Sequence, residues 1–219
     1  MAPESVTLVA VAKGQPAEKI VEAAGAGITD IGENYAQELK VHRVQLSAVS
    51  SQLRWHFIGH LQRNKVKEVV RQVELIHSVD SVRLAEEINR VAVSQGKIQP
   101  ILIEVNLGGE GSKTGVSSDE VEHLTGEMNR FLSLQLKGFM AIPPVSSAEG
   151  ACPEGARPFF QRLREIRDAI NRRSLYKAPL AELSIGMTED FEIAIEEGAT
   201  MVRIGTGIFG PREAGHGEV

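Results

Sequence analysis

The chain has 219 residues and a formal net charge of −5, and its content of apolar residues (42%) and charged residues (24%) is that of an ordinary globular protein. This acidic balance gives no general electrostatic reason to bind nucleic acid or an anionic membrane. No apolar run approaches the ~20 residues of a membrane-spanning helix, and the N-terminal residues do not resemble a secretory signal. The single cysteine, Cys152, excludes an internal disulfide, so we expect a reducing, cytoplasmic location.

Short apolar runs alternate with amphipathic stretches along the chain. We expect strands at 6–12, 28–32, 55–59, 75–78, 100–106, 134–140, 182–185 and 200–205. We expect helices between them, at 16–24, 34–46, 64–71, 82–94, 118–129, 158–172 and 189–196. The strands begin about 28 residues apart on average, and alternation at that period favours a parallel sheet.

Eight such units predict an α/β fold, a single (β/α)8 TIM barrel that spans residues 1–219. This fold usually needs about 250 residues, so we expect short loops and no second domain. The exception is the segment 142–156, whose prolines, glycines and serines predict a long loop, either a plain surface connection or a lid over the barrel mouth. Cys152 lies in this loop without a recognisable partner base, so we do not expect a nucleophile there.

Two glycine-containing loops follow the last two predicted strands, at 184–188 and 205–207. In a TIM barrel the functional residues lie at the carboxyl ends of the strands, and the loops after strands seven and eight commonly bind phosphate. Glycine lets backbone N–H groups approach an anion closely. Glycine after a strand is more often simple turn chemistry, but the two loops together predict a phosphate site.

Two basic residues are expected near the same rim. Strand alternation puts Lys13 on one face with Val9 and Val11, and Arg203 on one face with Met201. The first and last strands are neighbours in a closed barrel, so both basic side chains could flank one ligand; otherwise Lys13 simply reaches solvent at a strand end. An aldehyde-capturing amine, a phosphate site and an inward arginine together describe a site for pyridoxal 5′-phosphate (PLP).

A metal site at His56 and His60 is not expected. Residues four apart on a strand lie about 13 Å from each other, which is too far to share one zinc ion. We expect His60 to line the pocket at the strand end, and His56 to pack under Trp55 and Phe57.

Several segments together resemble the pyridoxal phosphate homeostasis protein family. The most specific is Trp-His-Phe-Ile-Gly-His-Leu-Gln-Arg-Asn-Lys at 55–65. Further matches follow in order along nearly the whole chain, at 9–13, 32–35, 105–106, 112–115, 184–188 and 203–210. One departure is that family members usually carry an extra helix before the first strand, which here begins near residue 6.

The resemblance implies a barrel like the alanine racemase N-terminal domain, of PLP fold-type III, with the cofactor held as an aldimine on Lys13. It implies that Arg203 meets the pyridine nitrogen. The phosphate would be surrounded by Ser184, Gly186, Met187, Gly205 and Thr206. The ring would be lined by Asn34, Ile58, His60 and Met140.

The resemblance also implies a function in vitamin B6 and amino-acid/keto-acid homeostasis without an established catalytic activity. We expect a monomer that stores and exchanges PLP, with PLP-dependent apo-enzymes as recipients. An arginine at the ring nitrogen disfavours a pyridinium and so makes the cofactor a weak electron sink. Racemases of this type also carry a C-terminal β domain with a tyrosine, for which we expect no room after Gly205.

Two other functions remain open from the sequence: a cryptic amino-acid racemase or lyase, and a cofactor-free interaction protein. A further hypothesis concerns Lys113, in the glycine-rich loop 108–115. This lysine could take the aldehyde from Lys13 during release; the alternative is a solvated loop lysine.

Overall fold

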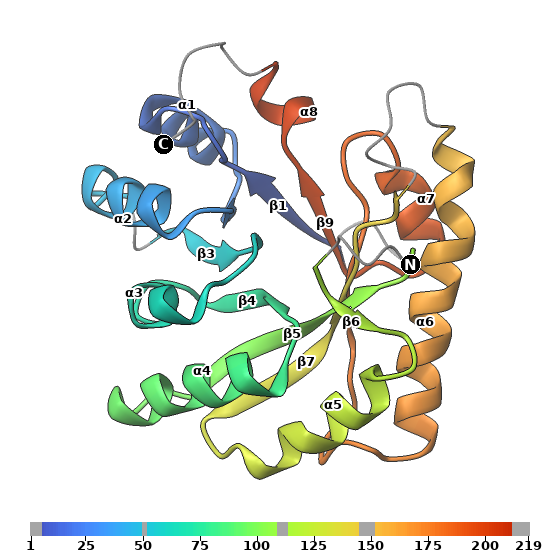
Figure 1. Cartoon of the computed structure of the whole chain (residues 1–219). Coiled ribbons are helices and arrows are strands. Elements are labelled where there is room, and N and C mark those ends of the chain that lie inside the picture. Colours follow the sequence, from blue (N-terminus) through green and yellow to red (C-terminus); the bar gives the residue numbers. More distant parts are fainter. Residues whose placement is uncertain (1–5, 50–51, 109–113, 145–151, 212–219) are drawn as a thin grey trace.

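The computed structural model describes residues 6–49, 52–108, 114–144 and 152–211. Within these ranges parallel strands pair in the order β4-β3-β2-β1-β9-β8-β7-β5, and a further β4–β5 pairing closes the ring (Figure 1). The predicted TIM barrel is therefore confirmed. Its strands are β1 Thr7–Val11, β2 Asp30–Glu33, β3 Arg54–Phe57, β4 Leu75–Val79, β5 Gln99–Asn106, β7 Leu134–Met140, β8 Glu182–Ser184 and β9 Met201–Ile204.

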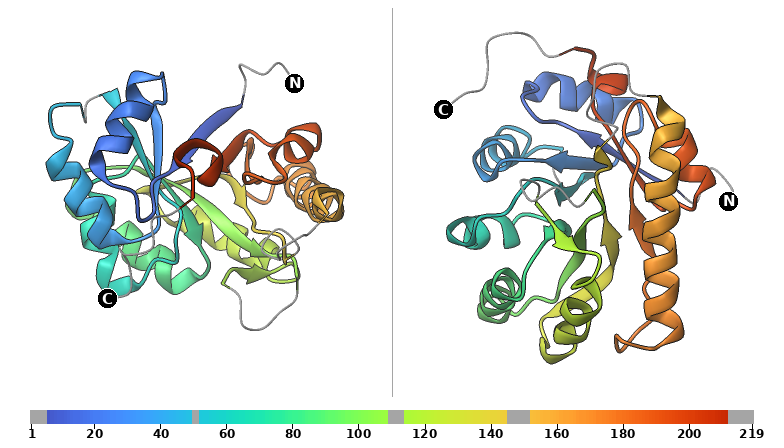
Figure 2. Two further views of the ribbon diagram at one scale, coloured as in Figure 1. Left: turned by 90° about the horizontal axis from the view of Figure 1, so that it is seen from above. Right: turned by 45° about the vertical axis from the view of Figure 1, so that its right-hand side comes forward.

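Helices surround the barrel, as the two views of Figure 2 show. They are α1 Ala17–Gly25, α2 Ala36–Gln45, α3 Val66–Val70, α4 Val82–Ser94, α5 Val121–Glu127, α6 Arg157–Arg172, α7 Phe191–Glu196 and α8 Thr206–Phe209. Three short elements were not predicted from the sequence. One is β6, Val116–Ser117, which pairs with the end of β5 outside the closed ring. The second is a 3-10 helix, Pro153–Ala156, inside the predicted loop 142–156, and the third is α8, which begins within the last glycine-containing loop.

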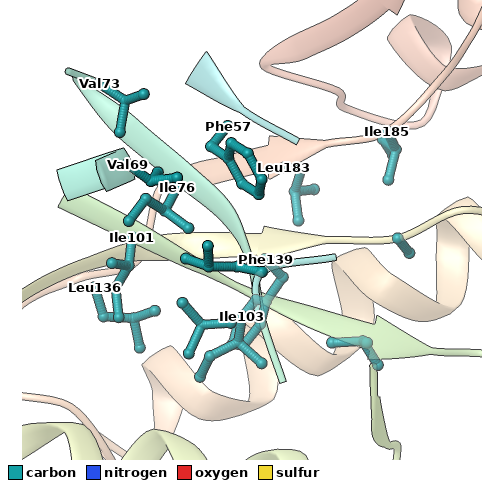
Figure 3. Close-up of a cluster of buried hydrophobic side chains, with 14 of the residues drawn as sticks. Phe57, Val69, Val73, Ile76, Ile101, Ile103, Leu136, Phe139, Leu183 and Ile185 are labelled. Carbon is teal, nitrogen blue, oxygen red and sulfur yellow. The ribbon is translucent and has the colours of Figure 1, made fainter. Parts of the chain in front are cut away.

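The main hydrophobic core lies between the barrel and its helices (Figure 3). The outward-facing side chains of the strands, such as Phe57, Ile76 and Phe139, are almost completely buried there. On the other side of this layer, Val69 of α3 and Val73 pack against them. Full burial of one such side chain stabilises the fold by about 1.5–3 kcal/mol, so this layer supplies most of the folding energy.

The barrel interior is partly polar. One small apolar cluster fills it, formed by Leu75, Leu102, Met140 and Met201. Next to it, buried polar side chains come from five strands: Asp30, His56, His77, Ser184 and Arg203. TIM barrel interiors are usually filled with branched apolar residues. Buried polar groups are costly unless they are hydrogen-bonded, so these five need partners within the barrel.

The position of His56 differs from the expectation that it packs under Trp55 and Phe57. Successive residues of a strand point to opposite faces, so when Trp55 and Phe57 face the helices, His56 faces the barrel axis. There its ring nitrogens lie 2.9 Å from Asp30 Oδ1 and 2.9 Å from His77 Nε2.

Two features can be excluded for the described residues. No helix among them is long and apolar enough to cross a membrane. No group of three or more histidine, cysteine or acidic side chains in these ranges is arranged to hold a metal ion. Of the predicted loop 142–156, residues 145–151 lie outside the described residues, so the lid stays a prediction; Cys152 is exposed.

Substitutions at two glycines, Gly138 and Gly126, test how closely the barrel strands pack. A Cβ atom at Gly138 in β7 would lie 1.9 Å from the carbonyl oxygen of Glu182 in β8, whereas one at Gly126 in α5 meets no atom within 4 Å. We expect Gly138→Ala to lower the free energy of unfolding by about 3 kcal/mol, because two paired strands must move apart. Gly126→Ala should raise it by about 0.5–1 kcal/mol, since alanine favours a helix. Urea unfolding of both variants measures the difference, and equal stabilities would contradict this description of the β7–β8 contact.

Candidate functional site

Lys13 lies at the carboxyl end of β1, on the rim of the barrel mouth. Its side chain is half-buried, and its Nζ atom lies 5.0 Å from the centroid of the Tyr35 ring. Asp30 faces the barrel interior, so Gly32, two residues further along β2, faces it too. A Cβ atom at Gly32 would lie 3.0 Å from the side chains of both Val9 and Ile58. Val9 therefore also faces the interior, as the alternation of β1 predicts. The amine thus follows the inward-facing positions of the first strand.

The loop that carries Lys13 is tied to α2. The amide of Gly14 donates to Glu38 Oε2 at 3.1 Å. Below the loop, His42 Nδ1 lies 2.7 Å from Glu33 Oε1, and both side chains are buried. Burial raises the pKa of Glu33 despite this bond. Burial alone would lower the pKa of His42, but its bond to Glu33 and the charges of Glu33 and Glu38 together outweigh that effect and raise it. A charge-assisted contact therefore anchors α2 under the Lys13 loop.

Arg203 is the central basic group of the site. It lies on β9, 4% exposed, level with Val9 of β1. Its Nη1 atom donates to the backbone oxygen of Ser184 at 2.6 Å and to Ser184 Oγ at 2.7 Å, and its Nη2 atom donates to the Ala141 oxygen at 3.1 Å. Burial lowers its pKa to about 10, so it stays charged at neutral pH. A guanidinium has five N–H donors, so further donors remain for a ligand.

The two glycine-containing loops meet, as the sequence predicts. The hydroxyl groups of Thr188 and Thr206 lie 3.2 Å apart, and the amide of Gly207 donates to Thr188 Oγ1 at 3.3 Å. Gly186 has φ +91°, and a Cβ there would lie 2.6 Å from the Cβ of Ala194, so only glycine fits. Hydroxyl groups and backbone amides are thus gathered beside the end of β9, a suitable donor set for an anion.

Two of the predicted phosphate residues are engaged elsewhere. The Ser184 side chain is fully buried inside the barrel, where its Oγ atom contacts Arg203 and lies 2.9 Å from His77 Nδ1. The amide of Met187 donates to Asp190 Oδ1 at 2.7 Å, and burial raises the pKa of Asp190. These groups of Ser184 and Met187 therefore already have partners within the chain, and their contact with a phosphate stays a prediction.

The four predicted ring-lining residues differ in their surroundings. Asn34 and His60 line a pocket of about 540 Å³ between the ends of β2 and β3. Asn34 Oδ1 is buried and has no hydrogen-bond partner among the described residues. The His60 ring, half-exposed, lies 3.6 Å from Asp80 Oδ2. Ile58 is buried at the end of β3, whereas Met140 lies deeper, in the apolar cluster of the interior.

Two residues near the mouth, Tyr35 and Glu104, were missed by the sequence reasoning. Tyr35 covers the Lys13 amine. Thr188, which lies in the predicted loop 184–188, joins the two loops. Glu104 is buried on β5, where it accepts a 2.5 Å hydrogen bond from Thr114 Oγ1, and burial raises its pKa. A charged residue within the apolar run 101–105 was the signal for Glu104. Lys113 lies outside the described residues.

The sequence of this chain matches known proteins over nearly its full length. Residues 2–213 match the family model of the alanine racemase N-terminal domain. A pyridoxal phosphate homeostasis protein from Aquifex aeolicus is 43% identical over 206 residues, which cover 94% of this chain and 87% of the relative. One from Vibrio alginolyticus is 40% identical over 214 residues, covering 96% of this chain and 88% of the relative.

A solved structure gives the same result. PipY of Synechococcus elongatus, determined with PLP bound, is 33% identical and superimposes with a TM-score of 0.87, covering 96% of this chain and 95% of PipY. Since the family model spans most of the chain and the relatives match over nearly their full length, this chain belongs to the alanine racemase N-terminal domain family, among its pyridoxal phosphate homeostasis proteins.

Proposed function

We propose that this chain is a single PLP-binding barrel domain, residues 1–219, that stores and exchanges the cofactor in vitamin B6 and amino-acid/keto-acid homeostasis. The names of its relatives and the PLP bound to PipY support this function. The observation that supports it is that β1, which precedes Lys13, pairs with β9, which carries buried Arg203, and that the two glycine-containing loops after β8 and β9 are in contact.

The groups at the mouth fit PLP. PLP supplies an aldehyde that an amine can capture, a ring nitrogen that accepts a hydrogen bond, and a negatively charged phosphate. Lys13 provides the amine, and the remaining N–H donors of Arg203 provide the partner for the nitrogen. Thr188 and Thr206, with the backbone from Gly205 to Gly207, would hold the phosphate. The unpartnered Asn34 Oδ1 leaves an acceptor for a ligand group.

The charge of Arg203 argues against catalysis. With a pKa of about 10 the guanidinium only donates hydrogen bonds at neutral pH, so it withholds a proton from the ring nitrogen. Without that proton the site stabilises a carbanion poorly, and we infer a carrier without catalytic activity. The alternative, a cryptic racemase or lyase, has the family description in its favour.

The rim is open enough for exchange. Tyr35 is 51% exposed, Thr206 is exposed and Lys13 is half-buried, so a small molecule can reach the amine from solvent. We propose that the protein acts as a monomer in the cytosol, and that PLP-dependent apo-enzymes receive the cofactor from it.

The role of Lys13 can be tested with Lys13→Ala and the control Lys67→Ala, an exposed lysine of α3. We expect the unmodified protein and the control to gain a visible absorbance with PLP, and Lys13→Ala to lack it. After borohydride reduction, peptide mapping should find the cofactor on Lys13. Cofactor fixed to another lysine would refute this assignment, and a colourless unmodified protein would refute PLP binding.

The absence of catalysis can be tested by deuterium exchange. With PLP and amino acids in D2O, we expect the α-protons to exchange no faster than with free PLP, because Arg203 leaves the ring nitrogen without a proton. Nuclear magnetic resonance measures this rate directly. Exchange well above that of free PLP would instead establish the racemase or lyase alternative.

A further inference from the structure

A continuous line of hydrogen bonds crosses the barrel interior from Arg203 to Asp30. Arg203 Nη1 lies 2.7 Å from Ser184 Oγ, which lies 2.9 Å from His77 Nδ1. His77 Nε2 lies 2.9 Å from His56 Nδ1, and His56 Nε2 lies 2.9 Å from Asp30 Oδ1. All five residues are at most 4% exposed. They belong to five different strands, so the line spans the inside of the barrel.

The two ends of this line lie at opposite ends of the barrel. Asp30 is the first residue of β2 and Arg54 the first of β3, and Arg54 binds both carboxylate oxygens of Asp30, at 2.8 and 2.6 Å. The Arg54 side chain is 61% exposed. The carboxyl ends of the strands, where Lys13 and the glycine-containing loops lie, form the other rim. The line therefore connects the candidate site with the distal rim.

The direction of every hydrogen bond in the line follows from proton counting. Arg203 can only donate, so Ser184 Oγ accepts from it and must place its own proton elsewhere. Among the described residues its one other side-chain contact is His77 Nδ1, which must therefore accept. The proton of His77 is then on Nε2 and is donated to His56 Nδ1. The proton of His56 is likewise on Nε2 and is donated to Asp30.

The electrostatic surroundings agree with a neutral His77 and with a charged acceptor at the end of the line. Burial, as the largest cause, and the nearby charge of Arg203 hold the pKa of His77 well below its usual range. Burial alone would raise the pKa of Asp30, but hydrogen bonds from His56, Arg54 and Thr29 outweigh it and hold that pKa well below its usual range. Asp30 is thus an ionised acceptor, and His77 is neutral.

A doubly protonated His56 would break this pattern. It would donate from both nitrogens, so His77 would have to accept at Nε2 and carry its proton on Nδ1. Ser184 Oγ would then face two donors, Arg203 and His77, and its own proton would lack the acceptor that the structure provides. A buried donor without a partner is costly, which favours the one-way arrangement.

We propose that Asp30, His56 and His77 are positioning residues for the PLP site, and that Asp30 at the distal rim fixes the ring protons of both histidines and, through Ser184, the position of Arg203. This proposal rests on the proposed function, since Arg203 is the group offered to the ring nitrogen. The acceptor at one end of the barrel would thereby determine how firmly the cofactor is held at the other.

The histidine protons can be observed directly in the protein without PLP. Long-range nitrogen–proton spectra of histidine-labelled protein distinguish the two neutral forms of the ring from the doubly protonated one. We expect both His56 and His77 to be neutral and to carry the proton on Nε2. A proton on Nδ1 of either ring, or a doubly protonated His56, overturns the proposal, and this measurement needs no variant.

Two variants test the coupling. In Asp30→Ala, each arrangement of the protons leaves one buried donor without a partner, either His56 Nε2–H or the Ser184 hydroxyl. We therefore expect the protons of both histidines to be shared between Nε2 and Nδ1, and the affinity for PLP to fall roughly tenfold through loss of this supporting hydrogen bond. The matched control Arg54→Ala removes the exposed partner of Asp30 but keeps the carboxylate. It should leave both ring forms unchanged and the affinity within about twofold. Thermal unfolding verifies that each variant is folded; should Asp30→Ala not fold, Asp30→Asn, which keeps an acceptor oxygen, should retain the Nε2 protons in both rings.

The outcomes separate this proposal from the proposed function. If Asp30→Ala moves the ring protons but leaves the PLP affinity unchanged, the positioning role is wrong and PLP binding stands. If the unmodified protein shows the expected ring forms but binds no PLP, the proposed function is wrong. If Arg54→Ala weakens PLP as much as Asp30→Ala does, general destabilisation of the distal rim explains the loss, and the positioning role is again overturned.

Discussion

The burial of the Arg203 guanidinium is the constraint on which the arrangement of this protein depends. A charge in a barrel interior is tolerated only when its hydrogen-bonding groups are satisfied. Here the partners are two backbone oxygens, of Ser184 and Ala141, and the Ser184 hydroxyl, all from adjoining strands or their ends. These contacts keep the guanidinium directed to one place. The Ser184 hydroxyl in turn has His77 as its hydrogen-bond partner. This part of the barrel interior is therefore polar instead of apolar.

The register of the barrel strands determines which residues lie near Arg203. The parallel register puts Arg203 of β9 beside Val9 of β1, and Ser184 of β8 beside Met201 of β9. Lys13 follows β1 at the rim, and the loops after β8 and β9 meet there. Residues separated by almost the whole chain are thus placed on neighbouring strands at one rim of the barrel. The Thr188 contact and the short helix α8 hold the last loop at this rim.

The sequence was sufficient to predict the fold and the rim, because strand alternation and strand order follow from periodicity. It placed Lys13 and Arg203 on inward positions and brought the two glycine-containing loops together. It failed for His56, since the apolar neighbours on both sides suggested a packed ring, although alternation points it the other way. The Ser184 hydroxyl contacts His77 and Arg203, which lie far from it in the sequence. The Met187 amide contacts the nearby Asp190. Such contacts leave no periodic signal.

The hydroxyl contact between Thr188 and Thr206 has a mechanical consequence. It fastens two backbone segments that belong to different strands, and the Gly207 amide adds a second link to the same oxygen. If these segments hold the phosphate of PLP as we propose, neither can move away from it without straining its contact with the other. Entry and departure of the phosphate would then involve both segments together, and weakening of either one would shorten the residence of the cofactor.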